Sequence, residues 1–321
     1  MHLRIGLAGS VLQSLQRSFS TSAMQKAAIK NVTVIGGGLM GSGIAQVAAA
    51  SGHKVTLVDM NADLLGASMK RIETSLSRVA KKKCDTEEKA KEMVEGVMKA
   101  ISTSTSSEDA VKETDLVIEA IVENLKVKQE LFKKLDAVAP SSTIFTSNTS
   151  SLPIGEIAAE TQRKDRFGGL HFFNPVPMMK LLEVVRTPDT SDETFESLLA
   201  FGKALGKTTV KCKDTPGFIV NRLLIPYLSE ASKLVERGDA SVEDVDLAMK
   251  LGAGYPMGPF ELSDYVGLDT SKFIMDGWAA RFPDDPLFQT PKILNDLVAQ
   301  GKLGMKTGEG YYKYEGGKKK T

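Results

Sequence analysis

His171 and Glu183, twelve residues apart, are the pair in this chain best suited to acid–base chemistry. His171 ends an apolar run, and open α/β sheets place their ligands at strand ends that face the crevice. A lone histidine beside two phenylalanines is more often a buried core residue. Glu183 lies inside the apolar run 179–185, where an acid is costly unless it is paired. If the two runs are neighbouring strands, Glu183 can hydrogen-bond His171 and stabilise its imidazolium, as in catalytic dyads. Otherwise Glu183 is a surface acid on an edge strand.

A glycine-rich turn predicts a dinucleotide site. Gly36, Gly38 and Gly41 form a G-x-G-x-x-G pattern between an apolar run and a small-residue helix, which is the context that this motif requires. Pyrophosphate would meet the free N–H groups at the start of that helix. Asp59, eighteen residues after Gly41, could accept hydrogen bonds from the adenosine ribose and would repel a 2′-phosphate, which favours NAD over NADP. The alternative is an ordinary glycine-rich turn with a capping aspartate.

The elements that must position these residues alternate between short β-branched runs and amphipathic stretches, which is typical of a mostly parallel, Rossmann-type α/β sheet. We expect strands at 31–35, 54–58, 115–120, 143–147, 167–172, 181–186 and 208–211, and helices at 39–50, 125–138 and 192–205. Two more helical stretches, 62–83 and 86–99, are too long for one crossover. They predict an antiparallel helical hairpin inserted at the periphery of the sheet.

The strand pattern stops after Asp214, and Gly and Pro breakers then separate helical stretches. We expect these helices at 218–236, 242–251, 260–266, 270–282 and 292–300. The sequence therefore predicts a nucleotide-binding domain at 28–213 and a smaller all-helical domain at 214–321. The basic end of the chain, 316–321, is expected to be a frayed tail.

The first 27 residues have a composition of their own. They contain Arg4, Arg17 and Lys26, many serines and threonines, and no acidic residue. This profile is typical of an organelle transit peptide, although a floppy basic tail is the alternative. We expect a mitochondrial transit peptide at 1–27, and its removal would change the formal net charge from +1 to about −2.

The totals argue against several classes of protein. A formal net charge of +1 gives no indication of nucleic-acid binding. Cys84 and Cys212 have no partner motif, which suits reduced thiols, and three histidines are too few for a zinc dehydrogenase. We therefore expect no metal site. No apolar run approaches the ~20 residues that span a bilayer, so no stable membrane insertion is expected.

Longer motifs give a more specific indication. In chain order they are VIGGGLMGSGIAQ, AIVENLKVK, SNTSSLPI, GLHFFNPVP, CKDTPGFIVNR and LGAGYPMGPFEL. Together they resemble the L-3-hydroxyacyl-CoA dehydrogenase family over essentially the whole chain after the first 27 residues, and the N-terminal composition favours its mitochondrial form. The resemblance implies NAD-dependent oxidation of L-3-hydroxyacyl-CoA to 3-ketoacyl-CoA in fatty-acid β-oxidation, in the mitochondrial matrix, by a homodimer.

The resemblance also implies roles for individual residues. His171 would take the proton of the 3-hydroxyl as hydride leaves C3 for the nicotinamide, and Glu183 would hold the imidazole. Ser150 and Asn221 would hydrogen-bond the substrate oxygen. The family's further NAD contacts match Glu123, Lys128, Ser150, Asn174 and Lys306, and its CoA contacts match Ser75, Lys82 and Ser150. The helical domain would bind substrate and form the dimer.

Three of these residues have a plainer alternative. Lys82 lies in a Lys81-Lys82-Lys83 run that could be a solvated helix end, Asn221 could be a polar residue near a helix cap, and Ser150 could be an ordinary loop residue. Two other functions also remain open: the same fold acting on 3-hydroxybutyryl-CoA or a sugar acid, and a non-catalytic NAD-binding protein.

Overall fold

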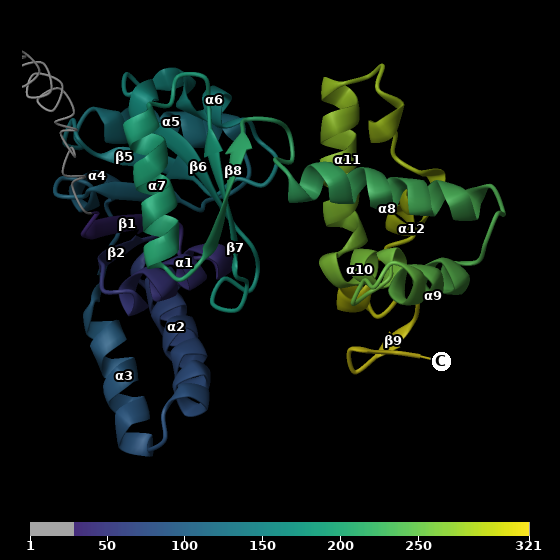
Figure 1. The fold of residues 1–321 in the computed structure, drawn as a ribbon, viewed down its shortest axis with the longest axis horizontal. Coiled ribbons are helices and arrows are strands. Elements are labelled where there is room, and N and C mark those ends of the chain that lie inside the picture. The colour runs from purple at the N-terminus through teal and green to yellow at the C-terminus, as the bar shows by residue number, and fades with distance from the viewer. Residues whose placement is uncertain (1–28, 321) are drawn as a thin grey trace, which may run out of the picture.

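The computed structural model describes residues 29–320. Its first domain is built on one eight-stranded sheet (Figure 1). Its strand order is β3-β2-β1-β4-β5-β6-β7-β8, and every neighbouring pair is parallel except β6 and β7. The strands are β1 Asn31–Ile35, β2 Lys54–Val58, β3 Ile101–Ser104, β4 Leu116–Glu119, β5 Ile144–Ser147, β6 Phe167–Phe172, β7 Leu181–Arg186 and β8 Thr208–Lys213. The mostly parallel sheet is confirmed, and β3 is a strand that the sequence analysis missed.

Helices cover both faces of this sheet. They are α1 Leu39–Ala50, α4 Ser107–Ala110, α5 Leu125–Asp136, α6 Ile154–Ile157 and α7 Asp192–Ala204. Two separate apolar clusters fill the two interfaces: one joins α1 and α7 to the sheet, and the other joins α5 and α6 to it. Because helices cover both faces, β1, β4 and β5 are buried along almost their whole length, as parallel strands usually are.

The inserted hairpin is confirmed as α2 Ala62–Lys83 and α3 Glu87–Lys99, which extend together away from the sheet (Figure 1). Each helix starts at a side-chain cap: Asn61 accepts from Leu64 N, and Thr86 accepts from Lys89 N. The buried stripe of α2, which includes Ile72 and Leu76, joins the core of the sheet. The hairpin is therefore anchored through α2.

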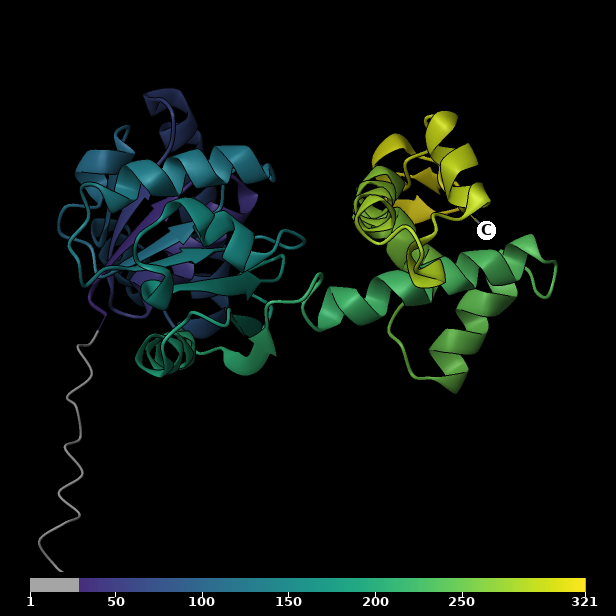
Figure 2. The ribbon, with the colours of Figure 1, turned by 90° about the horizontal axis from the view of Figure 1, so that it is seen from above.

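The second domain is helical, as predicted, with α8 Val220–Glu236, α9 Val242–Gly252, α10 Pro259–Val266, α11 Leu268–Arg281 and α12 Lys292–Ala299. Helix α8 runs out from the first domain to the other helices of the second (Figure 2). Within the described residues, no helix is long and apolar enough to cross a membrane.

The prediction of a frayed tail is wrong for residues 316–320. This segment is part of a small antiparallel hairpin, formed by β9 Tyr314–Glu315 and β10 Lys318–Lys319. Asp264 anchors the residues just before this hairpin, because its carboxylate accepts hydrogen bonds from Tyr311 N and Tyr312 N, both at 2.9 Å. The Lys319 ammonium lies 3.8 Å from the centre of the Tyr312 ring. The sequence analysis read only the charge of this segment and missed its buried anchors.

Candidate active site

His171 and Glu183 lie directly opposite each other on β6 and β7, as the dyad hypothesis requires. Because these two strands are antiparallel, side chains of opposed residues project from the same face of the sheet. His171 Nδ1 is 2.7 Å from Glu183 Oε2, and the side chains are 4% and 0% exposed. The acid in the apolar run is therefore paired and buried, not a surface residue on an edge strand.

Glu183 uses its other oxygen as well. Oε1 accepts from the backbone N–H groups of Ile219, at 3.1 Å, and Val220, at 2.9 Å, where α8 begins. Both oxygens of this carboxylate therefore act as acceptors. Nδ1 of His171 must then carry the hydrogen of their bond, which leaves Nε2 of the neutral imidazole free to accept a proton.

Ser150 meets that second nitrogen. Its Oγ is 3.1 Å from His171 Nε2, so the hydroxyl can donate to it. Ser150 follows β5, while His171 is the last residue but one of the neighbouring strand β6, so the parallel order of these strands brings the two residues together. A chain of hydrogen bonds thus runs from Glu183 through His171 to Ser150 and ends in a hydroxyl group.

Two aromatic rings pack against the imidazole. The ring centres of Phe173 and Phe218 lie 4.5 Å and 5.4 Å from that of His171. These rings exclude water from two sides and leave the imidazole few orientations. Among residues 29–320, no cluster of three or more His, Cys, Asp or Glu side chains could hold a metal ion.

The glycine-rich turn has the geometry of a nucleotide-binding loop. Gly36 has φ +100°, and a Cβ at Gly41 would lie 1.7 Å from the Gly36 carbonyl oxygen, whereas the space beside Gly38 is open. Gly38 also begins α1 without a side-chain cap in the described structure, so the N–H groups of its first turn remain available. This arrangement fits a pyrophosphate at the start of α1.

Asp59 has a contact that the sequence did not predict. Its Oδ2 accepts from Gly37 N at 2.8 Å and its Oδ1 from Met60 N at 2.7 Å, so it holds the glycine-rich loop. It also lines a pocket together with Gly36 and Gly38.

The Gly37 carbonyl of the glycine-rich loop is held by side chains that include two from the inserted hairpin of α2 and α3. Gly37 O accepts from Ser42 Oγ at 2.7 Å, from Ser68 Oγ at 2.6 Å and from Arg71 Nη1 at 3.0 Å. Ser68 and Arg71 belong to α2. The inserted hairpin therefore holds the nucleotide loop in place, a role that its sequence did not indicate.

A buried charge cluster lies beneath Ser150. The Lys128 ammonium, 1% exposed, is 2.6 Å from Glu119 and 3.2 Å from Glu123. Glu123 also accepts from Thr149 Oγ1 at 2.5 Å and from Ser150 N at 3.1 Å. Burial would raise the pKa of Glu123, but the Lys128 charge and the Thr149 hydrogen bond outweigh it and lower that pKa. The cluster therefore holds the loop that carries Ser150.

Glu119 is the member of this cluster that the sequence analysis missed. Its carboxylate is fully buried and also accepts from Ser147 Oγ at 2.5 Å and from Ile121 N at 2.7 Å. The signal was present in the sequence, because Glu119 closes an apolar strand just as Glu183 interrupts one.

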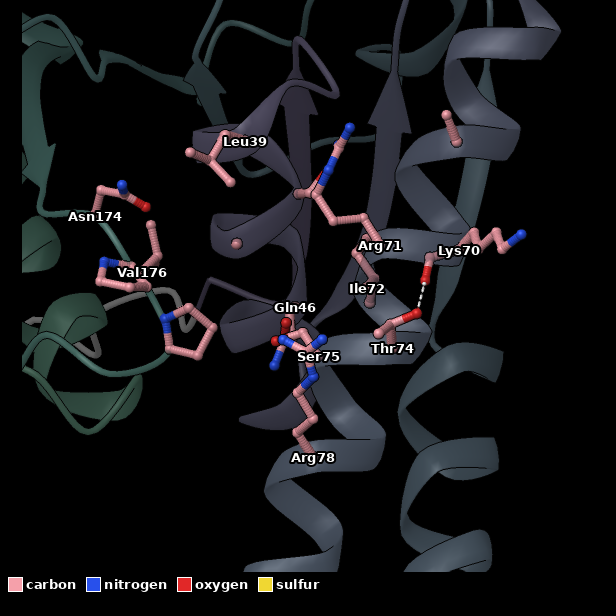
Figure 3. Close-up of a pocket in the computed structure, with 15 residues that line it drawn as sticks. Leu39, Gln46, Lys70, Arg71, Ile72, Thr74, Ser75, Arg78, Asn174 and Val176 are labelled. Atoms are coloured by element: carbon pink, nitrogen blue, oxygen red, sulfur yellow. Dashed lines mark hydrogen bonds between the residues drawn. The ribbon is translucent and has the colours of Figure 1, made fainter. Parts of the chain in front are cut away.

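Ser75 and Asn174 line one pocket between α2 and the chain after β6 (Figure 3). Arg71 and Arg78 of α2 line it too, so this wall is cationic. Lys82 is exposed one turn beyond Arg78 and is not among the residues that line the pocket.

Two expected site residues belong to the second domain. Asn221 is partly buried in the first turn of α8, one residue after the N–H that binds Glu183. Lys306 is paired with Asp269, its ammonium lying 2.6 Å from both carboxylate oxygens. Asn221 thus directly follows a residue that bonds Glu183, while Lys306 contacts its own domain.

Comparison with known proteins identifies the family. The model of the 3-hydroxyacyl-CoA dehydrogenase NAD binding domain matches residues 31–215, and that of the C-terminal domain of the same enzymes matches 217–314. Mitochondrial hydroxyacyl-coenzyme A dehydrogenase of Rattus norvegicus is 66% identical over 91% of this chain and 93% of its own, and the Homo sapiens enzyme is 63% identical over 95% and 99%. A crystal structure of (S)-3-hydroxybutyryl-CoA dehydrogenase from Ralstonia eutropha has a TM-score of 0.84 and 41% identity, covering 90% of this chain and all of that one. The chain belongs to the 3-hydroxyacyl-CoA dehydrogenase family and is an NAD-dependent dehydrogenase.

Proposed function

We propose that this enzyme oxidises L-3-hydroxyacyl-CoA to 3-ketoacyl-CoA with the His171–Glu183 pair as its general base. The observation that carries the proposal is the hydrogen-bonded chain from Glu183 Oε2 to His171 Nδ1 and from His171 Nε2 to Ser150 Oγ. It presents one unprotonated nitrogen beside one hydroxyl, which is what removal of a proton from an alcohol requires.

In this mechanism His171 Nε2 takes the proton of the substrate's 3-hydroxyl, and Glu183 stabilises the imidazolium that forms. Ser150 and Asn221 hydrogen-bond the same substrate oxygen and fix its distance from Nε2. NAD supplies the acceptor for the hydride that leaves C3. In the reverse direction His171 returns its proton to the oxygen of the ketone.

The cofactor would be held by residues already described. The glycines of the turn and the first N–H groups of α1 would bind the pyrophosphate, and Asp59 the adenosine ribose. We assign Glu123, Lys128, Ser150, Asn174 and Lys306 to the remaining NAD contacts. Because Lys128 is buried and paired, its part is to orient Glu123, and Lys306 would have to leave Asp269 or share it.

The CoA portion would lie along α2. Ser75 lines the pocket beside Asn174, Arg71 and Arg78 give its wall positive charge, and Lys82 continues the same helix towards solvent. Phosphate groups of CoA are suited to such a wall. The names of the rat and human relatives, which are hydroxyacyl-coenzyme A dehydrogenases, support this choice of substrate over a free hydroxy acid.

The proposal is tested by His171→Gln, with His53→Gln as the matched control. Loss of a positioned base typically lowers the rate by about 10²–10⁴. We expect that loss in kcat for His171→Gln with NAD affinity unchanged in calorimetry. His53 bonds Ile29 O and packs on Phe201, so its variant should keep full activity.

NADH absorbance is followed with acetoacetyl-CoA, with a free 3-keto acid and with no substrate. Near-normal turnover by His171→Gln would refute the mechanism. Equal turnover of the free acid would refute the CoA specificity.

We propose a mitochondrial matrix location and a role in β-oxidation, supported by the names of the relatives and by the acid-free composition of residues 1–27. The predicted transit peptide itself lies outside the described residues. We place the boundary between the NAD-binding domain and the substrate domain at Asp214. Import of the full chain into isolated mitochondria, followed by N-terminal sequencing, tests the location, and an intact Met1 after import would contradict the transit peptide.

We also propose that a second copy of the chain covers apolar side chains of the helical domain. Leu223, Leu251 and Phe273 are 70%, 79% and 63% exposed on α8, α9 and α11. Exposed apolar side chains that lie together in one patch usually mark an interface, and we propose that these three do so. Sedimentation should give a dimer mass for the wild-type chain and a monomer for Leu223→Glu combined with Leu251→Glu; a wild-type monomer would refute the proposal.

A further inference from the structure

Helix α8 depends on Glu183 for its N-terminal cap. Among the described residues, neither its N-cap residue Ile219 nor its first turn supplies a capping side chain or an acid. The N–H groups of Ile219 and Val220 bond Glu183 Oε1 instead, 36 and 37 residues earlier in the chain. One carboxylate therefore both orients His171 and satisfies the start of the helix that carries the second domain.

The residue just before this cap has an unusual backbone. Phe218 has φ +53°, and among residues 29–320 it is the only non-glycine residue with a positive φ. A left-handed conformation is unfavourable for residues with a Cβ and is kept only where surrounding contacts demand it. Here the turn directs the next two N–H groups at Glu183, while the buried Phe218 ring packs against His171.

The contacts on either side hold this turn in place. Asp214 accepts from Ile154 N and Gly155 N of the first domain, both at 2.8 Å. On the other side, a Cβ at Gly217 would lie 2.4 Å from the ring of Trp278 in the second domain. The Phe218 side chain belongs to the apolar core of the first domain, although α8 begins two residues later.

We propose that Phe218 is a positioning residue of the reaction, which acts through Glu183. Its left-handed backbone aims the Ile219 and Val220 N–H groups at Oε1, and this fixes the carboxylate so that Oε2 meets His171 Nδ1. Loss of the turn would leave the pair in contact with water and in several orientations. The inference rests on the proposed role of Glu183 in orienting the base.

Phe218→Ala and Phe218→Gly form the central comparison. Both remove the ring, but only alanine carries a Cβ that disfavours the left-handed turn. We expect Phe218→Ala to lower kcat at least about tenfold, with the KM values for NAD and acyl-CoA within about threefold of wild type. Phe218→Gly should keep several-fold more of kcat than Phe218→Ala, although it is the larger deletion.

Phe201→Ala is the matched control, because Phe201 is also buried and its ring also packs on a histidine, His53, at 5.1 Å. It should lower the melting temperature while leaving both kcat and KM within about twofold of wild type. A fall in kcat of the same size as in Phe218→Ala would show a general effect of lost packing and overturn the inference.

Combination with Glu183→Gln shows whether Phe218 acts through that carboxylate. In the Glu183→Gln background, Phe218→Ala should cost no more than about twofold in kcat, because residues that act as a unit are not additive. If Phe218→Ala does not fold, Phe218→Gly replaces it in this cycle. If Phe218→Ala lowers kcat as much in the Glu183→Gln background as in the wild type, the inference about Phe218 is overturned but the proposed function is not. If the Glu183→Gln single variant has full activity, the proposed function is overturned.

Discussion

Removal of the Lys128 ammonium should destabilise the first domain strongly. Lys128→Met keeps most of the length and apolar volume of the side chain but leaves two carboxylates, Glu119 and Glu123, without their cation. Taking one partner from a buried ion pair costs about 3–5 kcal/mol. Ser147 and Thr149 still donate to the two acids, which argues for the lower part of that range. For a domain of this size the loss corresponds to a fall of roughly 6–20 °C in melting temperature.

The loss of stability in Lys128→Met should depend on pH and should be smaller in acid. In the wild type the pKa of Glu123 is lowered, so its contribution to stability is present at pH 7 and is lost as the pH falls through that lowered pKa. Without Lys128 the main charge that offsets the burial of Glu123 is absent, so protonation of Glu123 costs the folded state less than it does in the wild type. The difference in stability between wild type and Lys128→Met should therefore be smaller at pH 5 than at pH 7.

Differential scanning calorimetry at pH 7 and pH 5 measures both effects. Trp278 is the single tryptophan and lies in the second domain, so its fluorescence reports separately on a domain that the substitution does not touch. Lys133→Met is the control, because Lys133 is on the same helix and forms an exposed pair with Glu160. It should shift the melting temperature by no more than about 2 °C. Equal losses for the two variants, or a larger loss for Lys128→Met at pH 5, would refute the reasoning.

Two further predictions concern the nucleotide loop and the thiols. Gly41→Ala should abolish measurable NAD binding in calorimetry while the chain stays folded, because the new Cβ would displace the Gly36 carbonyl; wild-type affinity would contradict the assigned geometry. Burial, with the nearby charges of Glu183 and Asp214, raises the pKa of the Cys212 thiol to about 11. Roughly one such thiol in a thousand is ionised at pH 8, so iodoacetamide should modify Cys84 and spare Cys212 in peptide mass spectrometry, and rapid labelling of Cys212 would count against its burial.

Most of the fold could be predicted from the spacing of apolar residues and from the positions of glycine and proline. The glycine turn, the long helical hairpin and the switch to helices after Asp214 are local patterns, and the structure has them within a few residues of their predicted bounds. Strand β3 was missed because it is four residues long and buries only Ile101, so it has neither the length nor the apolar content of a recognisable strand.

The site was predictable in part. The His171–Glu183 contact could be anticipated because an acid in an apolar run needs a partner, and the nearest candidate was on the preceding strand. Glu119 could be noticed in the same way, but its partners Lys128 and Ser147 could not be anticipated, because the three meet only through the order of β4 and β5 and the packing of α5. The backbone of Phe218 has no signature in residue types at all, since phenylalanine does not favour a positive φ.

The reversal of direction between β6 and β7 has a consequence for how such an enzyme can diversify. The eight residues 173–180 that join these strands include Asn174, Val176 and Pro177, which form part of the wall of the pocket over α2. Pairing in the ladder fixes His171 opposite Glu183, and a slip of one residue would send one of them to the other face. The connecting segment lies outside this register, although Lys207 Nζ bonds its Val176 O and Met179 O and Val176 is buried in the core. We expect changes that admit a different acyl group at its exposed side chains, such as Met178, while the proton-transfer pair stays in register.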